Sequence, residues 1–167
     1  QTWSVSNIDQ LTLSDEQVES IVSTSSAVVY TTREVPRRSL RIQNGQFSLI
    51  DDFELEGLQN SGDQFFAYDS FEVIRSTDGL SWESVSDPEA TSVLTGLFVR
   101  DNLWVVSDFQ GVVLKSDDAG QSWEDISSGL PDDPDAMTMD DSGHLVVAVG
   151  NLVYRTNDPL ISVSGVP

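Results

Sequence analysis

The segment Ser116-Asp-Asp-Ala-Gly-Gln-Ser-Trp123 decides the fold, because it recurs in the chain with strand-like sequence on both sides. A second copy, one residue shorter, reads Ser76-Thr-Asp-Gly-Leu-Ser-Trp82. A short apolar run precedes each copy and an alternating run follows its Trp, a pattern typical of two strands joined by a turn. In such a turn the Asp accepts hydrogen bonds from turn amides, the Gly supplies a positive φ, and the indole caps the hairpin. We therefore predict a structural role for Ser76, Asp78, Gly79, Ser81, Trp82, Ser116, Asp118, Gly120, Ser122 and Trp123.

Two weaker copies extend the pattern toward both ends of the chain. Thr156-Asn-Asp158 keeps the start of the segment but loses its Gly and Trp, so Thr156 and Asp158 are predicted to begin a turn of the same kind. The most degraded copy is Val35 to Phe47, in which Ser39-Leu-Arg41 places an Arg at the position of the Asp. The chain thus contains four related segments, of which the two middle ones are the best preserved.

The spacing of the repeats predicts the architecture. Large apolar residues that each precede an alternating run, at positions 3, 47, 82, 123 and 161, are separated by 44, 35, 41 and 38 residues. A period near forty residues belongs to a repeat of four short strands, and such sheets pack face to face around an axis. We predict an all-β fold, a β-propeller of four-stranded antiparallel blades with about four repeats of roughly 40 residues. Residues 1–167 would form one domain, with an outer strand at 1–7 and blades at about 8–51, 52–86, 87–128 and 129–167.

The two ends of the chain leave two interpretations open. If Ile161-Ser-Val-Ser164 is the outer strand of the last blade, then Trp3-Ser-Val-Ser6 belongs to a blade whose inner strands are missing. Alternatively, Gln1-Thr-Trp3 continues the segment that breaks off after Asp158 and completes that blade. The four repeats would then form either a closed four-bladed ring or part of a larger propeller.

Composition excludes several kinds of chemistry. Among 167 residues there are 28 acidic and 8 basic side chains, a formal net charge of −20, which repels nucleic acid. With no Cys and one His, the chain has no thiol chemistry and no His cluster for a metal. No apolar stretch approaches the roughly 20 residues of a membrane span. We predict no catalytic residue, metal or cofactor, although Asp132-Asp-Pro-Asp135 and Asp140-Asp141 leave calcium as an alternative.

The few basic residues show two patterns. Arg33, Arg37, Arg38 and Arg41 lie within nine positions and form a local positive cluster. They are the candidate binding residues for a glycan carboxylate or an acidic partner, the alternative being charge balance with nearby carboxylates. A basic residue also stands directly before the first position of every segment, which predicts a strand-face cation paired with a carboxylate in the same or the next blade. These residues are Arg38, Arg75, Lys115 and Arg155.

The two middle segments resemble the Asp-box, or bacterial neuraminidase repeat, Ser/Thr-x-Asp-x-Gly-x-Ser/Thr-Trp. The resemblance implies a propeller in which the box lies at the outer rim, far from the axial ligand site. Some relatives are glycosidases, and sialidases use an Arg triad and a Tyr paired with a Glu. The chain departs from that pattern, since it has no Arg-Ile-Pro segment and none of Tyr30, Tyr68 and Tyr154 has a Glu in the sialidase arrangement.

These observations lead to three functional hypotheses. The first is a non-enzymatic binding or assembly module for a protein or glycan partner, secreted, periplasmic or at the cell surface. The second is a segment of a sialidase-like or xyloglucanase-like glycoside hydrolase, and the third is a structural subunit of a surface layer, filament or virion. Because the chain starts with Gln1 and shows no leader, we expect a processed or excised piece, and another propeller segment or a second copy is a candidate partner.

Overall fold

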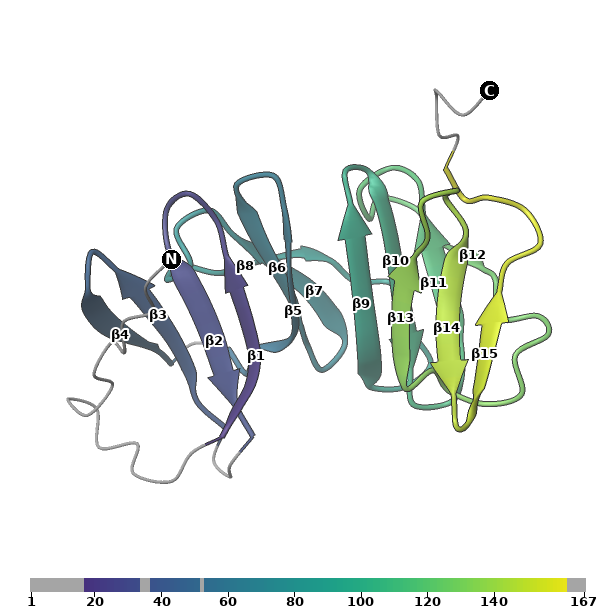
Figure 1. Ribbon diagram of the computed structural model, residues 1–167, viewed down its shortest axis with the longest axis horizontal. Helices are drawn as coiled ribbons and strands as arrows, with labels where there is room; N and C mark the ends of the chain where they lie inside the picture. Colours follow the sequence, from purple (N-terminus) through teal and green to yellow (C-terminus); the bar gives the residue numbers. More distant parts are fainter. Residues whose placement is uncertain (1–16, 34–36, 52, 162–167) are drawn as a thin grey trace, which may run out of the picture.

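The computed structural model describes residues 17–33, 37–51 and 53–161, and these residues form fifteen β-strands and no helix (Figure 1). The first two sheets each contain four consecutive antiparallel strands. The strands of the first sheet are β1 (Val18–Ser23), β2 (Val28–Thr32), β3 (Ser39–Gln43) and β4 (Gln46–Ile50). Those of the second are β5 (Glu56–Ser61), β6 (Gln64–Asp69), β7 (Glu72–Ser76) and β8 (Glu83–Ser86).

The third sheet repeats this topology and the fourth sheet contains three described strands. The third sheet contains β9 (Leu94–Arg100), β10 (Leu103–Asp108), β11 (Val113–Ser116) and β12 (Glu124–Asp125). The fourth contains β13 (Ala136–Met139), β14 (Leu145–Val149) and β15 (Leu152–Arg155). The prediction of an all-β fold built from repeated four-stranded antiparallel sheets is confirmed.

Face-to-face packing explains why the second strand of a sheet contains a continuous apolar run, such as Leu103 to Val106 in β10. Trp104 and Val106 of β10 belong to a core shared with the second sheet, whereas Leu103 and Val105 belong to a core shared with the fourth. A strand that is covered on both faces has no polar side, so its apolar residues run on without alternation. All six residues of β10 are accordingly buried.

The sheets follow one another along the long axis of the molecule, and three cores lie between them (Figure 1). The first strand of each sheet contacts the first strand of the next, β1 with β5, β5 with β9 and β9 with β13. The first and fourth sheets lie at opposite ends of this row. Apolar side chains are exposed there, Ile21 of β1 at 64% and Val153 of β15 at 72%.

The first sheet departs from the predicted alignment. Its last hairpin turns at Asn44 and Gly45, whose φ angles of 51° and 75° suit a two-residue turn. The segment Ser39-Leu-Arg41 therefore lies within β3, and the interpretation of these residues as a degraded turn was wrong. Strand register also places Arg41, and not Arg38, at the position of the basic residue in the other sheets. The equivalent cross-strand pairs are Val29–Arg41, Phe66–Arg75, Val105–Lys115 and Val146–Arg155.

The predicted outer strands at the ends of the chain fall largely outside the described residues. This holds for Trp3 to Ser6 and for Ser162 to Ser164. Ile161, the last described residue, is not in a strand, and its N–H points at the carbonyl of Gly143 at 3.4 Å. The limits proposed for the single domain and its blades stay a prediction.

Candidate functional site

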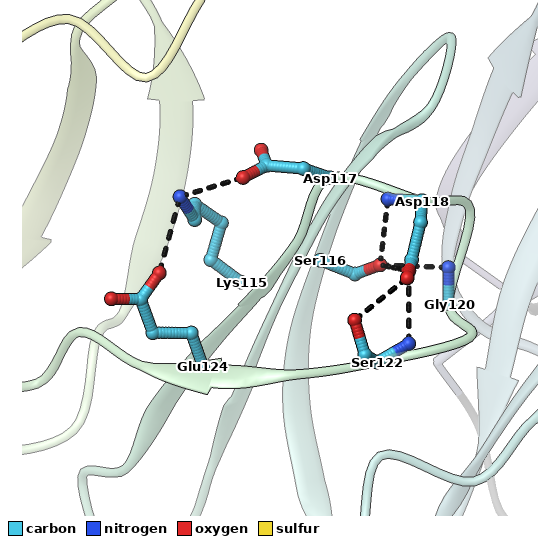
Figure 2. A network of polar contacts seen from close by, with 7 residues as sticks. All are labelled: Lys115, Ser116, Asp117, Asp118, Gly120, Ser122 and Glu124. Carbon is cyan, nitrogen blue, oxygen red and sulfur yellow. Dashed lines mark hydrogen bonds and ion pairs between the residues drawn. The ribbon is translucent and has the colours of Figure 1, made fainter.

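The turn of the third sheet is organised around one carboxylate (Figure 2). Asp118 Oδ1 accepts hydrogen bonds from the Ser116 hydroxyl at 2.8 Å and from the N–H groups of Gln121 at 3.0 Å and Ser122 at 2.9 Å. Asp118 Oδ2 accepts one from the Ser122 hydroxyl at 2.6 Å. The hydrogen bonds from Ser122, together with that from Ser116, lower the pKa of Asp118 to about 2. The carboxylate is saturated by its own turn.

The turn of the second sheet has the same organisation despite being one residue shorter. Asp78 Oδ1 accepts the N–H groups of Leu80 and Ser81, both at 2.8 Å, and the Ser76 hydroxyl at 3.1 Å. The Ser76 hydroxyl oxygen in turn accepts the N–H of Gly79 at 2.8 Å. Burial alone would raise the pKa of Asp78, but the hydrogen bonds from Ser81, Leu80 and Ser76 outweigh it and lower the pKa.

Both turns also join their sheet to the preceding one. Arg41 of the first sheet donates from Nε to the carbonyl oxygen of Asp78 at 2.6 Å. Ser86, at the end of the second sheet, donates its hydroxyl to the carbonyl of Gly120 at 2.6 Å and accepts the indole N–H of Trp123 at 3.1 Å. Sequence reasoning missed these contacts, because their partners lie 34 to 37 residues away along the chain.

The two turn tryptophans differ in how they meet the preceding sheet. Trp82 is 9% exposed and belongs to the first core with Ile50, the last residue of β4. Ser86 is the last residue of β8 and therefore occupies the corresponding place opposite Trp123. Because Ile50 offers no acceptor, the buried Nε1 of Trp82 has no hydrogen-bond partner among the described residues.

Three of the recurrent basic residues, Arg75, Lys115 and Arg155, form ion pairs inside their own sheets. The N–O distances are 2.7 Å for Arg75–Glu83, 2.9 Å for Lys115–Asp117, 3.3 Å for Lys115–Glu124 and 2.7 Å for Arg155–Asp140 (Figure 2 shows the two pairs of Lys115). The hydrogen bond from Arg155, with the N–H of His144, lowers the pKa of Asp140 to about 2. These side chains are charge partners within the fold.

The structure divides the four arginines of the predicted positive cluster among three places. Arg41 is directed to the second sheet, as described above, and Arg33 lies exposed directly after β2. Arg37 forms ion pairs with Glu56 at 2.5 Å and Glu19 at 3.9 Å. Arg37 and Arg38 line a groove of about 430 Å³ whose other lining residues are Ser39, Leu49, Ile50, Asp51, Phe53, Glu54 and Asp69. Three carboxylates share this groove, so it is not a uniformly positive anion site.

One tyrosine has a glutamate neighbour in space that the sequence did not reveal. Tyr68 of β6 pairs across the sheet with Glu56 of β5 and shares a hydrogen bond with it. Burial, and then the charge of Glu56, raise the pKa of Tyr68. Gly57, at a φ of 57°, leaves space for the ring, since a Cβ there would lie 2.3 Å from Tyr68 Cε1. Sequence spacing alone could not show a contact that depends on a bulge in β5.

An exposed apolar rim lies at the end of the second and third sheets opposite the Asp-centred turns. It consists of Phe71 in the β6–β7 turn, Val93 before β9 and Phe109 after β10, exposed at 48%, 47% and 71%. The N–H of Phe109 donates to the carbonyl of Val93 at 3.0 Å, and Leu94 donates to Ser70 at 2.7 Å. These backbone bonds place the three segments side by side. We call Phe71, Val93 and Phe109 the aromatic rim.

A buried carboxylate holds this rim in place. Asp108 is 1% exposed, and its Oδ2 accepts the N–H and hydroxyl of Thr91 at 3.1 and 2.8 Å and the N–H of Ser92 at 3.1 Å. Its Oδ1 accepts the N–H groups of Gln110 at 2.9 Å and Val112 at 3.0 Å. Asp108 therefore fixes two of the three segments that carry the rim, the loops of Val93 and Phe109. Sequence reasoning missed it, although an Asp also ends β6, at Asp69.

A cavity of about 420 Å³ lies between the third and fourth sheets. Its walls combine apolar residues of both sheets with the residues that follow β15, including Thr156 and Asp158. The Thr156 hydroxyl accepts the N–H of Leu145 at 3.2 Å, and its carbonyl contacts His144 Nδ1 at 2.8 Å. The turn predicted to begin at Thr156 and Asp158 thus starts beside a cavity, and no indole of the described residues lines it.

Carboxylates of the two acidic loops bind other groups of this same chain. Asp140 is bound by Arg155 as described above, and Asp135 Oδ2 accepts the N–H of Gly150 at 2.6 Å. No group of three or more metal-ligating side chains that could hold an ion occurs among the described residues. Nor does the described part of the chain contain a helix long and apolar enough to cross a membrane.

Comparison with known proteins shows which solved structures have a similar arrangement of sheets. No protein-family model matches the sequence, and no curated protein matches it either. Among solved structures, the designed protein Ika4 has a TM-score of 0.66 and 16% identity over 85% of this chain and 91% of that one. YCF48 bound to D1 peptide has a TM-score of 0.62 and 18% identity over 87% of this chain and 52% of that one.

A selenomethionine-substituted virginiamycin B lyase from Staphylococcus aureus has a TM-score of 0.66 and 18% identity, over 90% of this chain and 54% of that one. The chain therefore spans about half the length of YCF48 and of the lyase. At these identities the likeness concerns the fold alone. It confirms the predicted fold class: the four antiparallel sheets form a β-propeller of about four blades.

Proposed function

We propose that this chain is part of an Asp-box β-propeller that binds a protein partner through the aromatic rim. The observation that carries the proposal is the rim itself, two aromatic and one aliphatic side chain exposed side by side, with the loops of Val93 and Phe109 bound by the buried Asp108. Exposed apolar clusters of this kind mark interaction surfaces, and aromatic residues are enriched in protein interfaces. The Asp-centred turns belong to the opposite end of the sheets and serve the fold.

The charge of the chain indicates what kind of partner the rim selects. A net charge of −20 favours a partner with Lys or Arg around an apolar contact segment and speeds its association at low salt. A structural neighbour, YCF48, has been solved with a peptide bound, which supports a peptide or protein ligand for this fold. We propose that the protein is secreted, periplasmic or at the cell surface, which suits its strongly acidic composition.

Peptide selection tests this proposal directly. A random displayed peptide library is selected on the immobilised protein and counter-selected on the Phe71→Ala/Phe109→Ala variant. We expect enriched peptides that carry aromatic and basic residues and bind the double variant at least about 10-fold more weakly. Leu80→Ala is the matched control, because Leu80 is also exposed, at 38%, but lies in an Asp-centred turn. Peptides that bind the double variant and the wild type equally would contradict the assignment of the rim.

A second candidate function, part of a glycoside hydrolase, is favoured by the Tyr68–Glu56 pair beside Arg37. A tyrosine and a glutamate within hydrogen-bonding distance could act as nucleophile and base on a glycoside. The test is the release of fluorophore from a panel of umbelliferyl glycosides, with Tyr68→Phe as the control. Turnover by the wild-type protein that disappears in Tyr68→Phe would support the hydrolase function. No turnover by the wild-type protein would rule against this function.

A further inference from the structure

The cavity between the third and fourth sheets corresponds to the place of a turn tryptophan. In the preceding junction, Trp123 packs against a core that contains Val73, Val85, Trp104, Val106 and Leu114. Strand register assigns to these residues the equivalents Val113, Ile126, Leu145, Val147 and Tyr154, and all five line the cavity. The cavity is therefore equivalent to the space that Trp123 occupies between the second and third sheets. It is larger because Leu145 takes the place of the bulkier Trp104.

Among the described residues, no strand pairs with the sheet edge beside this cavity. β15 pairs with β14 on one side, whereas β7 and β11 each pair with a fourth strand on the other. Its residues Leu152 and Val153 are exposed at 55% and 72%. An apolar edge strand with unpaired backbone groups is a template for an added strand. By analogy with the third sheet, a segment that begins with Trp and continues as a strand of alternating side chains would fill this cavity and pair with this edge.

The first residues of the chain match that description. Gln1-Thr-Trp3-Ser-Val-Ser6 repeats the second half of the third-sheet turn and its strand, Gln121-Ser-Trp123-Glu-Asp-Ile-Ser127, with one residue fewer. It has the same length after the aromatic residue as Phe47-Ser-Leu-Ile50, which forms β4. The chain thus carries the first half of this turn after β15 and the second half at residues 1–6.

We infer that residues 1–6 of a second copy of this chain pair with β15 and insert Trp3 into the cavity between the third and fourth sheets. β1 and β15 lie at opposite ends of the row of sheets (Figure 1), so a second copy brings the segment to β15 without the chain crossing the row. The same association covers the outer face of each end sheet, where Ile21 and Val153 are exposed. Two chains that exchange these segments reciprocally form a closed dimer.

Disulfide trapping tests the exchange, since the chain has no cysteine to interfere. The pairing of Ser39 with Ile50 in the first sheet predicts that Ser6 lies opposite Val153. Two single variants, Ser6→Cys and Val153→Cys, are mixed and oxidised, and the mixed disulfide is measured by mass. We expect a linked species of twice 18.3 kDa in high yield. Leu152→Cys is the control, because the neighbouring residue points to the opposite face of the strand.

Native mass spectrometry of the unmodified protein gives the second readout. We expect a dimer whose dissociation constant rises at least about 100-fold in Trp3→Ala, since buried Trp anchors dominate interfaces, and which Ser4→Ala leaves within a few-fold. A wild-type protein that stays monomeric at high concentration would overturn the inference. So would equal trapping by Val153→Cys and Leu152→Cys, or an intrachain disulfide in a monomeric Ser6→Cys/Val153→Cys double variant.

Discussion

Trp123→Ala is expected to destabilise the protein by about 3–5 kcal/mol, the range for removing a large aromatic side chain from a packed site. The indole packs on the core between the second and third sheets and donates its N–H to Ser86. Its loss removes the packing and one hydrogen bond together. For a chain of this length about 1 kcal/mol shifts the melting temperature by about 2–4 °C, so we expect a decrease of about 6–20 °C.

Two phenylalanine variants separate the hydrogen bond from the packing. Trp123→Phe removes the indole N–H that donates to Ser86. Trp82→Phe removes an indole N–H that has no hydrogen-bond partner among the described residues. A net hydrogen bond contributes about 1 kcal/mol, so we expect Trp123→Phe to cost about that much more than Trp82→Phe. The free energies come from urea unfolding followed by circular dichroism. A shift of less than one degree in Trp123→Ala, or equal costs for the two phenylalanine variants, would refute the assigned role of the turn.

Two further predictions concern the same turns. Gly120→Ala should destabilise by at least about 2 kcal/mol in the same unfolding assay, because φ is +82° there and a Cβ would lie 2.6 Å from Trp104 Cζ3; unchanged stability would contradict this close approach. The folded-state pKa values of about 2 for Asp118 and Asp140 lie below the ordinary value of 3.8, so their stabilising contribution is complete above about pH 4 and is lost as the pH falls toward 2. Titration of the carboxyl groups by NMR should show these low pKa values, and the pKa of Asp118 should rise in Ser122→Ala. An Asp118 pKa that does not change in this variant would contradict the conclusion that hydrogen bonds lower it.

The sequence predicted those parts of the fold that depend on local chemistry. The Ser-x-Asp turns, their glycines and the four-strand period are local patterns, so the all-β class and the repeated sheets could be inferred from them. The first sheet was aligned wrongly at Arg38, because its hairpin uses Asn44 and Gly45 where the others use an Asp-centred turn. Register, which only the paired strands show, assigned that position to Arg41.

The candidate site was much less predictable. The arginines drew attention because they are close in sequence, but Arg37 and Arg41 are bound to different elements of the second sheet. The aromatic rim combines the β6–β7 turn with two loops of the third sheet, so no sequence window contains it. The cavity lies between the third and fourth sheets, where no indole of the described residues fills it, and only packing across two sheets can show this. In each case the decisive contacts join residues that are well separated along the chain, by 37 positions for Arg41–Asp78 and by 16 for Phe109–Val93.

The measurement that tests the proposed binding function most directly is hydrogen–deuterium exchange, with and without a peptide selected on the protein. If the aromatic rim is the binding surface, the peptide will slow exchange in the loops around Phe71, Val93 and Phe109. Exchange in the Asp-centred turns at 76–82 and 116–123 will stay unchanged. Protection of those turns with the rim unaffected would contradict the proposal and move the binding site to the opposite end of the sheets.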